Sequence, residues 1–61
     1  RGDLELGAEE WANGHHPEAL ARWEALASGG SASAAVWYNL GNARYDGGDR
    51  PRAIAAWRAA C

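Results

Sequence analysis

The stretch Trp37–Arg58, WYNLGNARYDGGDRPRAIAAWR, decides the fold of this chain. It predicts one helical hairpin: an amphipathic helix that runs to Tyr45, a Gly-Gly-Asp turn, and a second helix that starts after Pro51. Gly48 stands where the first helix must stop, and a positive φ there is cheap only for glycine. Proline fits the first turn of the following helix, where no donor N–H is needed, and Asp49 precedes it as a candidate N-cap.

The same arrangement of residues occurs 34 residues earlier in the chain. Large and small residue types recur together in register, which favours a structural repeat over coincidence. The matched pairs are Leu6 and Leu40, Gly7 and Gly41, Gly14 and Gly48, Pro17 and Pro51, Ala19 and Ala53, Ala21 and Ala55, Trp23 and Trp57, and Ala25 and Ala59.

Small residues in the repeat predict a close approach of two helices. Gly41 follows Leu40, so a neighbouring helix can come near at the glycine, and Ala53 allows the same approach from the other side of the hairpin. Trp57 lies four residues further along and is expected to fill the wider space beyond the glycine.

These residues give the chain a resemblance to the tetratricopeptide repeat (TPR) family, whose period is 34 residues. The resemblance covers one nearly complete repeat, Ala34–Cys61, and a weaker one over 1–33. Two kinds of departure make the first repeat an atypical, terminal one. The family's tyrosine normally falls one position before Tyr45, where the second repeat has Arg44 and the first has Glu10. In the first repeat Asp3 and Ser31 also replace the first tryptophan and the closing proline. The family pattern is carried by Trp37, Leu40, Gly41, Tyr45, Ala53, Trp57 and Ala60.

We therefore expect an all-α fold of two TPR-like helix-turn-helix hairpins, stacked as a short right-handed α-solenoid. The four antiparallel helices are predicted over about 3–13, 17–27, 33–46 and 51–60, and Ser31 or Ser33 is expected to cap the third. The chain is expected to form a single domain, residues 1–61, and to be a piece of a longer protein, because two repeats make a thin core.

In the TPR family the first helix of each hairpin lines a concave surface that binds peptides or helices of partner proteins. The resemblance implies a non-enzymatic protein-protein interaction module. Tyr38, Asn42 and Tyr45 share one helical face, which suits a peptide site with aromatic and amide groups. An alternative for Trp11 and Tyr45 is packing within or between the hairpins. The residues implied for the groove are Tyr38, Asn42, Tyr45, Asp46, Asn39, Ala35, Trp11, Ala8 and Leu4.

A structural role is the alternative function. Exposed helix faces would stack on copies of the chain or on neighbouring repeats, and the predicted self-association face is Ile54, Trp57 and Ala60. The two functions differ in the surface that matters, the groove or the last helix, and self-association also predicts a concentration-dependent size.

Three further predictions concern charged and polar side chains. Glu10 and Arg44 occupy the same place in the two repeats and are predicted either to form an interhelix ion pair or to be independent exposed charges. Glu18 and Arg22 are spaced for an i,i+4 pair. The adjacent His15 and His16 are expected in a solvated turn rather than at a metal, because no third ligand has the required spacing.

The composition excludes several functions. A net charge of −2 offers no basic stripe for nucleic acid. No apolar run long enough to span a membrane occurs, and no catalytic constellation, cofactor motif or metal motif is present. The carboxylate-gripping TPR subclass expects a lysine where this chain has Leu4. The single Cys61 excludes an internal disulfide and is expected to be a small packing residue or, if exposed, a cross-linking thiol.

A narrower resemblance is carried by Ser33–Ala34 followed by WYNLGNARY after a glycine- and serine-rich joint. It is similar to the TPR segment of bacterial aerotolerance-operon membrane proteins. The resemblance implies a bacterial protein, either cytoplasmic or anchored at the inner membrane with this segment facing the periplasm.

Overall fold

The computed structural model describes residues 2–30 and 32–61, and this part of the chain is all-helical, with four helices and no strand. The helices are α1 (Asp3–Ala12), α2 (His16–Ser28), α3 (Ala34–Asp46) and α4 (Arg50–Ala60). The all-α prediction is confirmed, and each predicted helix is present within one or two residues of its expected bounds. The chain enters α2 and α4 one residue before the prolines, which occupy the first turn as predicted.

Local signals set the helix ends. Gly48 has a φ of +87°, as predicted, and its counterpart Gly14 has a φ of +83°. The Asp49 carboxylate accepts the Arg52 backbone N–H at 3.3 Å, and the Ser33 hydroxyl accepts the Val36 N–H at 3.4 Å. The alternative cap Ser31 lies outside the described residues.

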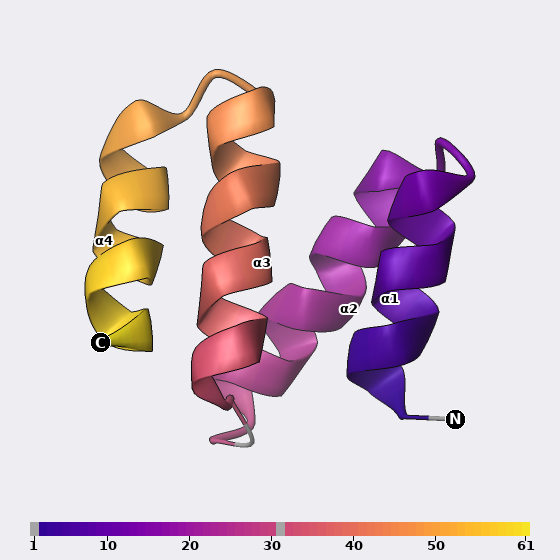
Figure 1. Ribbon diagram of the computed structural model, residues 1–61, viewed down its shortest axis with the longest axis horizontal. Helices are drawn as coiled ribbons and strands as arrows, with labels where there is room; N and C mark the ends of the chain where they lie inside the picture. Colours follow the sequence, from indigo (N-terminus) through magenta and orange to yellow (C-terminus); the bar gives the residue numbers. More distant parts are fainter. Residues whose placement is uncertain (1, 31) are drawn as a thin grey trace.

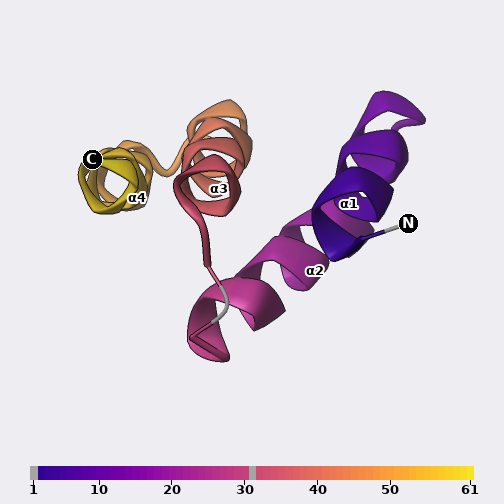
Figure 2. The ribbon, with the colours of Figure 1, turned by 60° about the horizontal axis from the view of Figure 1, so that its bottom comes forward.

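The four helices form two antiparallel hairpins that meet through α2 and α3. Figure 1 shows α1 beside α2 and α3 beside α4, and Figure 2 shows the same order from another side. In both views α1 and α4 lie at opposite ends of the molecule. The main buried cluster lies where the hairpins join, and its members are Ala19, Trp23, Val36, Leu40 and Ala43.

Each hairpin is closed by a tryptophan that lies directly over a glycine. A Cβ built on Gly7 would lie 2.4 Å from Trp23 Nε1, and one built on Gly41 would lie 2.4 Å from Trp57 Nε1. The expectation that Trp57 fills space beyond the glycine is therefore wrong. The flat indole needs the absent side chain itself, because any β-carbon would overlap the ring.

The apolar side of α1 is only partly buried. Gly7 is buried, and Leu4 and Trp11 are half-buried against the core, whereas Ala8 and Ala12 are exposed. The reason is position: α1 is an end helix that packs mainly on α2, so one face of it is covered.

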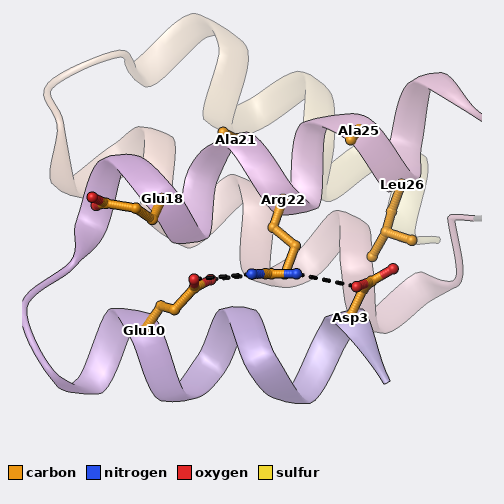
Figure 3. A pocket seen from close by; sticks show the side chains of 7 residues that line it. All are labelled: Asp3, Glu10, Glu18, Ala21, Arg22, Ala25 and Leu26. Carbon is orange, nitrogen blue, oxygen red and sulfur yellow. Dashed lines mark hydrogen bonds and ion pairs between the residues drawn. The ribbon is translucent and has the colours of Figure 1, made fainter. Parts of the chain in front are cut away.

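Arg22 forms ion pairs with Glu10 and Asp3 instead of the predicted pair with Glu18. Its guanidinium donates to both Glu10 carboxylate oxygens, at 2.8 and 3.0 Å, and to Asp3 at 3.2 Å, while Glu18 points elsewhere (Figure 3). Arg44 lies 3.6 Å from Glu24 instead of pairing with Glu10. The predicted Glu10–Arg44 and Glu18–Arg22 pairs are both wrong, because α1 packed on α2 offers Arg22 a bidentate carboxylate.

Among the described residues, no helix is both long and apolar enough to cross a bilayer.

Candidate functional site

A cavity of about 170 Å³ lies between α1 and α3, with α2 behind it. It holds four of the nine residues predicted for the groove: Ala8 and Trp11 from α1, and Asn39 and Asn42 from α3. Trp23 and Ala43 complete the lining. No charged side chain lines this cavity, so its walls are aromatic, methyl and carboxamide groups.

The remaining predicted groove residues lie around the cavity rather than in it. Tyr38 and Tyr45 are 57% and 53% exposed, and the Tyr45 ring lies 5.7 Å from Trp57, which is the packing alternative for Tyr45. Leu4 packs against the core, and Ala35 is exposed on α3. Asp46 lines a neighbouring hollow instead.

That neighbouring hollow, of about 230 Å³, adjoins the cavity through Trp11 and Ala43. There the His16 ring stacks on Trp11 with centroids 3.7 Å apart and planes 12° apart. His16 Nδ1 also lies 4.0 Å from an Asp46 carboxylate oxygen. His16 was expected to be an ordinary turn residue. The stack depends on how α1 meets α2 across the turn, and the sequence carried no signal for it.

The two repeats differ in one hydrogen bond. Trp57 Nε1 donates to Asn42 Oδ1 at 3.2 Å. The counterpart of Trp57 is Trp23, and the counterpart of Asn42 is Ala8, which has no acceptor. Trp23 Nε1 is buried, and no described residue accepts its N–H. In both hairpins the indole nitrogen is the atom nearest to the glycine, so by equivalence with Trp57 and Asn42 we infer that the Trp23 N–H faces the side of Ala8, a residue that lines the cavity.

The cavity therefore combines aromatic rings with two carboxamides. Asn42 uses its oxygen to hold Trp57, which leaves its NH₂ group as a donor, and Asn39 has both a donor and an acceptor. The Trp11 and Trp23 rings, with centroids 6.0 Å apart, form an apolar wall beside these groups. Neutral hydrogen-bonding groups with aromatic walls suit an uncharged polar ligand such as an amide.

A larger hollow, of about 600 Å³, lies on the outer face of the first hairpin. Its floor is apolar, and its polar members are dominated by carboxylates (Figure 3). The hydrogen bond from Arg22 holds the pKa of Glu10 below its usual value, so this carboxylate is charged at neutral pH. The residues of this face are Asp3, Glu10, Glu18, Ala21, Arg22, Ala25 and Leu26.

The described residues contain no group of three or more side chains that could hold a metal ion. Cys61 is exposed, and its Sγ donates to the Trp57 carbonyl at 3.5 Å, so the expectation of a small packing residue is wrong and the alternative of an exposed thiol applies. Its thiol is accessible because α4 ends at Ala60 with nothing of the described chain covering it.

Comparison with family models, with curated proteins and with solved structures found no match to this chain.

Proposed function

We propose that this chain is a TPR-like, non-enzymatic interaction module, a short right-handed α-solenoid that binds a peptide segment of a partner protein between α1 and α3. The observation that carries the proposal is the cavity between these helices, where Trp11, Trp23, Asn39 and Asn42 converge. The TPR resemblance of the second hairpin and the 34-residue register support the same surface.

The chemistry of the cavity favours a peptide in extended conformation over a helix. An extended backbone presents free N–H and C=O groups at every residue, whereas a helix satisfies its own. Asn39 and the NH₂ group of Asn42 can pair with such groups, and the Trp11 ring offers a flat surface for an apolar side chain. The neutral lining disfavours a charged terminus as the central contact, since a buried charge needs a partner.

The direct test is selection from a displayed library of random linear peptides. The protein can be immobilised through Cys61, its single and exposed thiol, which lies at the end of α4 and outside the cavity lining. Enriched peptides are then measured against two variants: Ala8→Phe, which fills the cavity from an exposed position, and Asn39→Ala, which removes one amide.

Tyr38→Ala is the matched control, because Tyr38 is exposed on the same helix but does not line the cavity. We expect Ala8→Phe to abolish binding, and Asn39→Ala to weaken it about fivefold, the equivalent of one hydrogen bond of about 1 kcal/mol. Circular dichroism verifies that each variant is folded. Peptides that bind the parent and folded Ala8→Phe equally well, or no enriched peptide at all, would refute the proposal.

A further inference from the structure

The second helices of the two hairpins carry matching stripes of side chains, but only one stripe is covered. Trp23 on α2 is 3% exposed, whereas its counterpart Trp57 on α4 is half-buried. Leu20 is half-buried, whereas its counterpart Ile54 is 44% exposed. The stripe of α2 is His16, Leu20, Trp23, Glu24 and Ala27, and the α4 stripe is Arg50, Ile54, Trp57, Arg58 and Cys61.

The cover over the stripe of α2 is α3, the first helix of the next hairpin. Glu24 lies 3.6 Å from Arg44, Leu20 shares a hollow with Ala43, and Ala27 shares another with Trp37. This contact between α2 and α3 indicates what the equivalent stripe of α4 can bind. The partner would be the first helix of another hairpin, with a charge opposite to that of the central charged residue of the stripe.

The charges of the two end helices are complementary. α1 carries four acidic residues and no basic one, while α4 carries three arginines and no acidic residue. At the centre of this contact, the sign of the charge is reversed at both equivalent positions. Arg58 stands where α2 has Glu24, and Glu10 stands where α3 has Arg44. The Glu24–Arg44 pair therefore has an inverted counterpart, Arg58 on α4 with Glu10 on α1, and these two helices lie at opposite ends of the molecule (Figure 1).

The outer face of the first hairpin has room for a helix. Its hollow of about 600 Å³ has a floor of Ala21, Ala25 and Leu26. Glu10 and Asp3 line the same hollow and point across it toward Arg22 (Figure 3). This floor suits an aliphatic side chain such as Ile54, and the carboxylates suit an arginine beside it.

We propose that α4 of one copy docks on the outer face of the first hairpin of a second copy, so that the chain associates head to tail. Arg58 joins Glu10 of the second copy and Cys61 comes beside Asp3, as Glu24 lies beside Arg44 and Ala27 comes beside Trp37 within one chain. This interaction surface is distinct from the cavity between α1 and α3, and it does not depend on the proposed peptide binding.

The contact is heterologous, because the two faces differ. Within the described chain no segment lies between the two faces, because α1 and α4 are at opposite ends in both views (Figure 2). A heterologous contact of this kind adds copies in a row unless the rotation closes a ring. The mean size of the assembly is then expected to rise with concentration. It is also expected to fall with salt, since the charges lie near the surface and the Debye length is about 3 Å in about 1 M salt.

Sedimentation velocity of the 61-residue chain at low salt, from micromolar to millimolar concentration, tests the proposal. Arg58→Glu should weaken association about tenfold, because it places two carboxylates together. Arg52→Glu is the matched control: it changes the net charge equally on the same helix, lies outside the α4 stripe and leaves association within about twofold of the parent.

A mixture provides the complementary result. Glu10→Arg by itself should also associate about tenfold more weakly than the parent, but an equimolar mixture of Glu10→Arg and Arg58→Glu should associate more strongly than either variant alone, because every contact between the two variants pairs opposite charges. Glu10→Arg removes the partner of Arg22, so its fold is verified by circular dichroism. A parent that stays monomeric at millimolar concentration and low salt, equal losses in Arg58→Glu and Arg52→Glu, or a mixture of folded variants that associates no more strongly than either variant alone would overturn the proposal.

Disulfide cross-linking tests which residues of the two copies lie side by side, and it does not need the Glu10→Arg variant. In an Asp3→Cys variant, oxidation should join Cys61 of one copy to the introduced thiol of the next and give a ladder of multimers, identified by mass spectrometry of the linked peptides. Ala8→Cys is the control, because Ala8 lies on the groove side of α1. Links between Cys61 residues alone, or equal ladders from both variants, would show that the copies do not meet head to tail.

Discussion

Ala8→Asn is expected to stabilise the chain by giving the buried Trp23 N–H an acceptor. The second repeat already shows the bond that this change would build, between Trp57 Nε1 and Asn42 Oδ1 at 3.2 Å. A buried donor without a partner costs about 1–3 kcal/mol, and satisfying it should recover about 1.5 kcal/mol. Replacing alanine by asparagine inside a helix costs about 0.6 kcal/mol. The net gain is about 1 kcal/mol, or about 4–8 °C in Tm for a domain of this size.

Thermal unfolding followed by circular dichroism measures the gain, and the indole signal of Trp23 in a ¹⁵N-correlated NMR spectrum reports the new bond through slower hydrogen exchange. The reciprocal change, Asn42→Ala, is the matched control. It should cost no more than about 0.5 kcal/mol, because Trp57 is half-buried and water can replace the lost acceptor. An Ala8→Asn variant with an unchanged or lower Tm, and no added protection of the Trp23 N–H, would refute the reasoning.

Three further predictions follow from single contacts. Gly41→Ala should destabilise the fold by about 2 kcal/mol in denaturant titration, because the new methyl group would lie 2.4 Å from Trp57 Nε1. This overpacking outweighs the gain in helix propensity, and a stabilised variant would contradict the tight contact. Gly48→Ala should cost about 1 kcal/mol in the same assay, because φ is +87° there and an L side chain is strained; an unchanged midpoint would contradict this. Arg22 lowers the pKa of Glu10 in the folded state, so the ion pair should stabilise the fold fully above the usual pKa of 4.5. This stabilisation should be lost as the pH falls through the lower pKa of the folded state. Unfolding measured against pH should therefore show a smaller loss of stability on acidification in Glu10→Gln than in the parent, and identical acid profiles would count against the pair.

Four of the six residues that line the candidate cavity were among those that the sequence predicted for the groove. Ala8, Trp11, Asn39 and Asn42 were assigned to the groove from helical register and the TPR resemblance, and they do line one cavity. Tyr38 and Tyr45 were assigned by the same rule and lie outside it, since neighbouring positions on a helix differ by a rotation that only the packing of α3 on α2 and α4 resolves. The unpartnered N–H of Trp23 could be found only from the tertiary structure, because it depends on which residues surround the indole.

What the sequence determined by itself is local: where each helix starts and stops, and which positions repeat. The proline positions, the cap at Asp49 and the positive φ of Gly48 depend on backbone sterics and on hydrogen bonds within a few residues, so they follow from residue type and order.

Only the tertiary structure decided which partner each repeated side chain meets. Arg22 takes Glu10 rather than Glu18 because α1 brings two carboxylate oxygens into bidentate reach. Trp23 is buried and Trp57 is only half-buried, although both lie over a glycine, because α3 covers the stripe of α2 and no described segment covers the equivalent stripe of α4. Residues at equivalent positions in a repeat share their local geometry, but their neighbours depend on their place in the stack, and those neighbours set burial, charge pairing and the surfaces available for binding.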